Sequence, residues 1–232
     1  MTSNDAVHES RNFFLEGPAG RLDAILWKPF ADRQPALAAV VCHPHPLFGG
    51  TMHNKVVYQA AKSLDALGLP VLRFNFRGAG TSAGTHDRGH GEQGDVKAAL
   101  DFLASEFPGA PLLLAGFSFG SWVGLRVGCA DQRVQELIAL GTPVNSVDFA
   151  YLQKCEKPKL FIHGSNDVHG KLNTLEALLE SLPGENQLVV VNDADHFFAG
   201  KLDQVDAAIR MWLQDRHPSM QSLPRPTPIR HG

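Results

Sequence analysis

The sequence predicts an α/β fold in which one mostly parallel, twisted sheet of about eight strands is covered by helices on both faces. Short apolar runs alternate along the chain with longer segments that carry apolar residues at helical spacing. Several of the short runs are continuously apolar, as expected of strands that are buried on both faces. The 232 residues, 44% of them hydrophobic and 19% charged, are enough for one large domain with a sizeable core.

The first predicted element is a β-hairpin over residues 12–29. Two short runs flank a turn at residues 17–20, whose sequence is Gly-Pro-Ala-Gly. In the second run Leu22, Ala24 and Leu26 alternate with more polar residues, which predicts one buried face.

The following segments alternate between predicted strands and predicted helices. Strands are expected at residues 36–42, 69–76, 111–115, 136–141, 158–164 and 186–192. Helices are expected at residues 54–68, 95–107, 119–130, 171–182 and 202–215, with a Gly-rich loop over residues 77–94. We therefore expect a flexible N-terminus over residues 1–10, one domain over residues 11–216 and a Pro-rich, disordered tail over residues 217–232.

Charge and composition exclude several classes of partner. The net charge of −3, with Lys and Arg scattered, gives no electrostatic basis for binding nucleic acid or a membrane. The three cysteines are widely spaced and form neither a disulfide framework nor a CxxC metal motif, which favours a reducing compartment. No segment has the apolar length of a signal peptide core or a spanning helix, so the expected location is the cytoplasm. The sequence holds no signal for an oligomeric state.

Three polar side chains follow three of the predicted strands. Ser118 follows the strand at 111–115, Asp167 the strand at 158–164, and His196 the strand at 186–192. In a parallel sheet the carboxyl ends of the strands lie at one edge, where ligands bind. We therefore expect a hydroxyl, a carboxylate and an imidazole at that edge.

The segment around Ser118, GFSFG, matches the nucleophile-elbow motif G-x-S-x-G, and the chain order Ser, Asp, His is the order that accompanies it. A serine hydroxyl is a weak nucleophile at neutral pH, so Ser118 needs His196 as a general base. His196 in turn needs Asp167 to fix its tautomer and to stabilise the imidazolium. Flanking glycines let the strand and the helix approach each other closely.

An oxyanion formed at Ser118 needs backbone N–H donors. The N–H of Phe119, at the start of the following helix, is one candidate. The second is expected from the loop after residue 42, where Pro44 and Pro46 have no N–H. That leaves His45 and Leu47, with a slight preference for Leu47.

Five segments in this order resemble the α/β-hydrolase superfamily: CHPHPLFGGTMHNKVV, FNFRGAGTSAGTHDRGHGEQGD, GFSFGSWVG, HGSNDVHG and DADHFF. More narrowly, they are similar to small, lidless bacterial hydrolases related to dienelactone hydrolases and short-chain esterases, over roughly residues 12–215. The resemblance implies an α/β-hydrolase fold without a cap domain, a triad of Ser118, Asp167 and His196, and carboxylester hydrolysis. Dienelactone hydrolases carry Cys at the nucleophile position, whereas this chain carries Ser118, which argues against dienelactone substrates.

Each of the three residues has a competing interpretation. Ser118 could cap the helix that follows it, and Asp167 could cap the helix near Lys171. Asp148 is an alternative acid, and Asp193 and Asp195 are weaker ones because they lie close to His196 in sequence. His163 and His169 compete with His196 for the role of base.

Two further segments have a composition that could indicate ligand binding. The cluster of His43, His45 and His53 has a spacing found in metal sites, but an intervening Pro and the lack of a nearby carboxylate or Cys favour a loop-shaping role. The loop RGAGTSAG lacks the spacing of a phosphate-binding loop and is read as a tight loop beside the pocket. The candidates for lining an acyl pocket, each of which could equally belong to the core, are Phe117, Phe119, Phe197 and Phe198.

The expected function is hydrolysis of small to medium carboxylic esters through an acyl-enzyme on Ser118, with a small-molecule ester as substrate and no cofactor. The segment after residue 141 is too short for a helical lid, which suits an open site. Hydrolase-fold thioesterases, acyltransferases and peptidases share all of these residues and stay open as alternatives. A binding module without turnover is a further alternative, and reaction of Ser118 with a fluorophosphonate would distinguish it from an enzyme.

Overall fold

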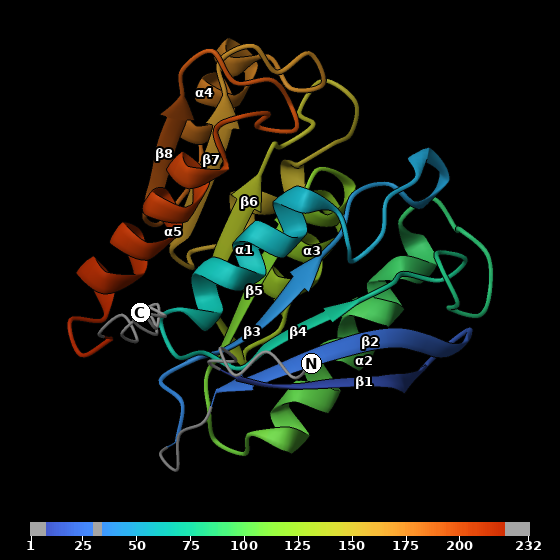
Figure 1. Cartoon of the computed structure of the whole chain (residues 1–232). Coiled ribbons are helices and arrows are strands. Elements are labelled where there is room, and N and C mark those ends of the chain that lie inside the picture. Colours follow the sequence, from blue (N-terminus) through green and yellow to red (C-terminus); the bar gives the residue numbers. More distant parts are fainter. Residues whose placement is uncertain (1–7, 30–33, 221–232) are drawn as a thin grey trace, which may run out of the picture.

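The computed structural model describes residues 8–29 and 34–220, which form one sheet flanked by helices (Figure 1). The strands are β1 (His8–Gly17), β2 (Gly20–Pro29), β3 (Ala38–Cys42), β4 (Val71–Phe74), β5 (Leu112–Phe117), β6 (Val134–Leu140), β7 (Lys159–Gly164) and β8 (Asn186–Val191). They lie in the order β1-β2-β4-β3-β5-β6-β7-β8. β1 pairs with β2, and β2 with β4, in antiparallel orientation. The six strands from β3 to β8 are all parallel to one another. The predicted fold class is therefore confirmed.

Helices cover both faces of the sheet (Figure 1). One face packs against α1 (Lys55–Asp65) and α5 (Leu202–Arg216). The other packs against α2 (His90–Glu106), α3 (Phe119–Ala130) and α4 (Leu172–Glu180). Two short 3₁₀ helices, η1 (Pro46–Phe48) and η2 (Ala150–Lys154), lie in connecting loops.

The continuous apolar sequence of β3 follows from these two layers. Its side chains alternate, so Ala38 and Val40 contribute to the core under α2 and α3. Ala39 and Val41 contribute to the core under α1 and α5. Because both faces of the strand are dry, every position of β3 is apolar.

The ends of the domain differ from the expected boundaries of 11 and 216. β1 begins at His8, whose ring stacks on Trp27 with centroids 4.6 Å apart and bonds to Asp65 at 2.8 Å. The polar sequence of residues 8–10 reflects an exposed edge strand, which pairs along its whole length with β2, rather than a flexible segment. At the other end, His217 contacts Glu136 at 2.8 Å and Met220 is buried. Residues 1–7 and 221–232 lie outside the described part of the chain.

Helix α2 begins at His90, five residues before the expected start at residue 95. The carboxylate of Glu92 accepts hydrogen bonds from the N–H groups of Asp87 and Gly89 at 2.8 Å each, which caps the helix inside the Gly-rich segment. The glycines of this segment therefore do not all belong to a loop.

The connection from β6 to β7 contains η2 and no inserted domain, in agreement with the short segment that follows residue 141. Among residues 8–29 and 34–220, no helix has the length and apolar character needed to cross a membrane.

Candidate active site

Ser118 lies in a tight turn between the carboxyl end of β5 and the amino end of α3. Its backbone has φ 54° and ψ −119°, a conformation that residues other than glycine rarely adopt. Ser118 occupies the N-cap position of α3, but its side chain makes no capping hydrogen bond, so the interpretation of its hydroxyl as a helix cap is wrong. The turn instead directs the hydroxyl away from the helix and into a cavity.

The two glycines of the motif are required by close contacts between backbones. A Cβ at Gly116 would overlap the carbonyl oxygen of Gly120, and a Cβ at Gly120 would overlap the carbonyl oxygen of Cys42. The strand-to-helix turn can therefore form only with glycine at both positions, as the sequence predicts.

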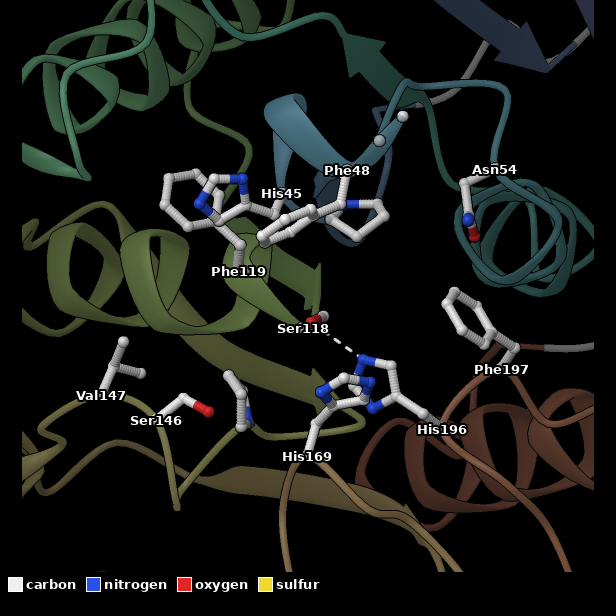
Figure 2. A pocket seen from close by; sticks show the side chains of 14 residues that line it. His45, Phe48, Asn54, Ser118, Phe119, Ser146, Val147, His169, His196 and Phe197 are labelled. Atoms are coloured by element: carbon white, nitrogen blue, oxygen red, sulfur yellow. Dashed lines mark hydrogen bonds between the residues drawn. The ribbon is translucent and has the colours of Figure 1, made fainter.

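The three polar side chains expected at the strand ends form one hydrogen-bonded chain, of which Figure 2 shows the bond between Ser118 and His196. His196 Nε2 lies 2.9 Å from Ser118 Oγ, and His196 Nδ1 lies 2.7 Å from Asp167 Oδ2. Asp167 and His196 are both 5% exposed, so these bonds are largely shielded from water. With Nδ1–H donating to the carboxylate, Nε2 is free to accept the serine proton.

The surroundings of Asp167 favour its ionised form. Burial raises the pKa of the Asp167 carboxyl, but the hydrogen bond and charge of His196, together with His163, outweigh burial and lower the pKa below its ordinary value. Its other oxygen, Oδ1, accepts the N–H groups of His169 and Gly170 at 2.8 and 3.1 Å. Asp167 therefore caps a local turn and also faces His196.

The competing acids have other partners. Asp148 accepts the N–H of Ala150 at 2.7 Å and is exposed. Asp195 accepts the N–H groups of Phe197 and Ala199, both at 3.0 Å. Among the hydrogen bonds of the described residues, Asp167 is the carboxylate that contacts His196.

The competing histidines also have other places. His163 is fully buried, and its Nε2 contacts the carbonyl oxygen of Gly170 at 2.5 Å, which closes the turn that contains Asp167. The ring of His169 lies 4.5 Å from the ring of His196 and lines the cavity. Neither of them contacts Ser118 Oγ among the described hydrogen bonds.

The structure separates the two candidates for the second oxyanion donor. The N–H of Leu47 donates to Nδ1 of His45 at 3.2 Å, and the Leu47 side chain is 69% exposed outside the cavity. The preference for Leu47 is therefore wrong, because its N–H caps η1. Among the hydrogen bonds of the described residues, neither the N–H of His45 nor that of Phe119 has an acceptor, and both residues line the cavity with Ser118.

His43 orients the peptide that carries the His45 N–H. Its Nε2 accepts the N–H of Phe76 at 2.9 Å, so its Nδ1 carries the proton and donates to the carbonyl oxygen of Pro44 at 2.6 Å. The peptide between Pro44 and His45 is trans, so its N–H points opposite to that carbonyl. Fixing the Pro44 oxygen therefore fixes the direction of the His45 N–H. This role of the His43 ring goes beyond the general loop-shaping role that the sequence suggested.

Because His43 is buried and neutral, we expect it to make the protein less stable in acid. Burial lowers the pKa of His43 from 6.5 to about 4. The hydrogen bond to Pro44 opposes this shift, and the charge of His45 adds to it. Between these pH values the unfolded chain binds more protons at this site than the folded one, so lowering the pH favours unfolding. The full difference is about 3 kcal/mol, present above pH 6.5 and lost by pH 4.

The measurement is urea unfolding of the wild type and His43→Asn at several pH values from 7 to 4. The wild type should lose about 3 kcal/mol of unfolding free energy relative to the variant over this range. A difference between the two proteins that does not change with pH would contradict a neutral, buried His43.

Ser118 lies at the base of an open cavity of about 230 Å³ (Figure 2). The cavity walls are mainly apolar and include Pro44, Phe48, Phe119, Pro143, Val147 and Phe197. Of the four phenylalanines proposed for an acyl pocket, Phe119 and Phe197 line this cavity, whereas Phe117 and Phe198 belong to the core under α1 and α5.

Four exposed apolar side chains lie on three of the loops that contribute residues to the cavity, and we call them the apolar rim. They are Leu47 (69% exposed), Phe48 (87%), Val168 (80%) and Phe197 (53%). The loops follow β3, β7 and β8. Exposed apolar groups of this size beside a cavity are typical of a binding surface.

One set of contacts to the cavity-lining residues His45 and Phe119 was not predicted. The ring of His86 lies 4.5 Å from the ring of His45, and its Nδ1 lies 2.8 Å from Oε1 of buried Glu92. Phe119 packs on both imidazoles, at 4.9 Å from His45 and 5.5 Å from His86. The spacing of Gly89 and Glu92, which is that of a helix cap, was the available signal that this segment is ordered.

The fold and the site together define the class: the chain has an α/β serine hydrolase fold, with a serine, a histidine and an aspartate hydrogen-bonded at the carboxyl edge of its sheet. A family model described as "Alpha/beta hydrolase domain" matches residues 39–213, and the chain belongs to this α/β-hydrolase family.

Several bacterial proteins are similar to it over most of their length. A Xanthomonas campestris structure, XC6422, named as an a/b serine hydrolase without lid, is 38% identical with a TM-score of 0.84, covering 93% of this chain and 97% of the other. An alpha-beta serine hydrolase homologue from Coxiella burnetii is 35% identical with a TM-score of 0.82, covering 92% and 99%. RP471 of Rickettsia prowazekii is 37% identical over 209 residues, 86% of this chain and 87% of that protein.

Proposed function

We propose that the protein is a serine hydrolase that cleaves small to medium carboxylic esters through an acyl-enzyme on Ser118. The observation that carries this proposal is the chain of hydrogen bonds from Ser118 through His196 to Asp167 at the base of an open, apolar cavity. This arrangement contains a nucleophile, a general base in the required tautomer and a carboxylate that orients it.

In the first half of the reaction, Ser118 Oγ attacks the carbonyl carbon of the ester while His196 Nε2 takes the hydroxyl proton. The negative charge that develops on the carbonyl oxygen is held by the N–H groups of Phe119 and His45, neither of which has an acceptor within the described part of the chain. The bond to the alcohol then breaks, and the His196 imidazolium returns the proton to the leaving oxygen.

In the second half, water attacks the acyl-enzyme and His196 takes a proton from it. The second tetrahedral intermediate breaks its bond to Ser118 Oγ, which regains the proton from His196. The products are an alcohol and a carboxylic acid. Asp167 stays ionised throughout and stabilises the imidazolium.

The substrate class follows from the shape and lining of the cavity. It is open, no inserted domain covers it in the described chain, and its walls and the apolar rim offer apolar contacts to an acyl chain. Burying an apolar chain there gains about 25 cal/mol per Å² of surface removed from water. Esters with a short or medium acyl chain fit this description.

The test is hydrolysis of p-nitrophenyl esters with acyl chains of two to twelve carbons, together with labelling by a fluorophosphonate. We expect turnover that is greatest for the shorter chains, and one fluorophosphonate adduct on Ser118. A folded protein that hydrolyses none of the esters and is not labelled would contradict the proposal and favour a binding module. Labelling without ester turnover would move the assignment to a thioester, amide or other acyl substrate.

The assignment of the His45 N–H as the second oxyanion donor can be tested by removing that N–H. His45 has φ −57°, which proline accepts, so His45→Pro deletes the N–H without changing the backbone angle. We expect kcat for ester hydrolysis to fall by roughly 10²–10³-fold.

The matched control is His45→Ala, which loses the same imidazole and the same contact with Leu47 but keeps the N–H. Its kcat should stay within about tenfold of the wild type, since side-chain contacts near an active site contribute less than an oxyanion donor. Equal losses in both variants would show that the ring, and not the N–H, is what the reaction needs.

A further inference from the structure

A second cavity, of about 610 Å³, lies beside the one that contains Ser118. It is bounded by the start of α1 and by the loop that leads from β8 into α5. Asn54 and Phe197 line both cavities, so the two are adjacent. Ser118 lines the first cavity and not the second, so the second has no place in the bond-making steps of the proposed reaction.

Both walls of the second cavity are held by other contacts. Ser63 Oγ lies 2.7 Å from Asp206 Oδ1, a hydrogen bond that joins α1 to α5. At the start of α1, Asn54 Oδ1 accepts the N–H of Val56 at 2.9 Å and caps the helix. In the opposite wall, Phe198 has φ 53°, and its side chain is fully buried in the core under α1 and α5. The second cavity is therefore built on fixed elements.

The second cavity lies on the side of Ser118 from which an alcohol would leave. In the proposed reaction His196 returns its proton to the leaving oxygen, so the alcohol departs next to His196 Nε2. The ring of Phe197 lies 5.3 Å from the ring of His196. In Figure 2, Phe197 lies to the right of Ser118, on the same side as His196, and Val147 lies to the left. An alcohol that leaves beside His196 therefore extends toward Phe197 and the second cavity.

We propose that the second cavity binds the alcohol half of the ester, and that the protein prefers esters of bulky alcohols, of the size of 2-phenylethanol, to esters of small ones. This assignment rests on the proposed ester hydrolysis at Ser118 and adds the alcohol side of its specificity. The ring of Phe197, 53% exposed between the two cavities, offers an aromatic surface to such an alcohol. Leu202 adds an apolar wall, and Thr51 and Lys55 can donate hydrogen bonds to polar substituents.

The experiment compares kcat/KM of the full-length protein for ethyl acetate and for 2-phenylethyl acetate. Both esters release a primary alcohol from the same acyl group, so the comparison measures binding on the alcohol side. We expect 2-phenylethyl acetate to be preferred by roughly 10- to 100-fold, the gain from burying a phenyl group. In Ala199→Phe the new ring occupies the second cavity, so this preference should fall by about tenfold or more.

The matched control is Ala130→Phe, the same change at an exposed alanine at the opposite end of α3 from Ser118, which should keep the wild-type preference. Ala199→Phe should also keep the wild-type preference between ethyl butanoate and ethyl acetate, because the acyl chain lies on the other side of Ser118. A second measurement needs no turnover. In a titration of the wild type with 2-phenylethanol, the changes in amide chemical shift should concentrate in residues 51–56 and 197–202.

Equal kcat/KM for the two acetates, or a preference that survives in Ala199→Phe, would overturn the alcohol site and leave the proposed hydrolysis at Ser118 intact. Shift changes centred on Val147 would place the alcohol on the other side of Ser118 and would also overturn it. Hydrolysis of none of these esters, p-nitrophenyl acetate included, would contradict the proposed function and the alcohol site together. The wild-type titration decides the question even if Ala199→Phe fails to fold.

Discussion

Ser118→Ala is expected to lower kcat for ester hydrolysis by roughly 10⁵–10⁶-fold, the loss seen when the nucleophile of a serine–histidine–aspartate triad is removed. The alanine variant cannot form the acyl-enzyme, so any remaining rate comes from water attacking an ester held in the cavity. The oxyanion donors are backbone groups and are unchanged, which is why some catalysis over the uncatalysed rate should persist.

The stability of this variant should be nearly that of the wild type. Among the described hydrogen bonds, Ser118 Oγ bonds only to His196, and the turn itself is defined by backbone contacts at Gly116 and Gly120. A melting temperature within a few degrees of the wild type, a change of about 1 kcal/mol or less, would show that the lost activity is chemical.

Ser146→Ala is the matched control for Ser118→Ala, because Ser146 lines the same cavity and its side chain is exposed. Its kcat and its labelling by the fluorophosphonate should be those of the wild type. If Ser118→Ala kept wild-type turnover on p-nitrophenyl esters, the proposed reaction on Ser118 would be refuted, whatever the hydrogen bonds suggest.

The fold could be predicted from the sequence because each strand and helix has its own local signal. The run at β3 is apolar at every position, as a strand covered on both faces must be, and the hairpin turn lies at residues 17–20 as expected. The local sequence signal does not predict the ends of elements whose boundaries are set by tertiary contacts. β1 starts at a polar segment because His8 packs on Trp27, and α2 starts early because Glu92 caps it.

Ser118, Asp167 and His196 could be grouped from the sequence because each follows a parallel strand, and parallel strands end at one edge. The oxyanion donor could not be chosen in the same way. The N–H groups of His45 and Leu47 differ only in that the His45 ring accepts the Leu47 N–H, a contact within one loop that no periodicity indicates.

Asp167→Asn is expected to lower kcat by roughly 10⁴-fold with little change in structure. The reason lies in the two oxygens of the carboxylate. Oδ1 accepts the N–H groups of His169 and Gly170, so the amide oxygen of the asparagine must occupy that position. The amide NH₂ group then replaces Oδ2 and faces His196 Nδ1.

An NH₂ group at this position can only donate, so His196 would accept it at Nδ1 and carry its own proton on Nε2. In that tautomer Nε2 cannot take the proton of Ser118, and the nucleophile is not activated. The measurement is kcat for a short p-nitrophenyl ester, with Asp148→Asn as the control for loss of one carboxylate on a nearby loop. Asp148→Asn should leave kcat unchanged, because Asp148 bonds to Ala150 and not to His196. The reverse result, a large loss in Asp148→Asn and a small one in Asp167→Asn, would assign the orienting acid to the loop after β6.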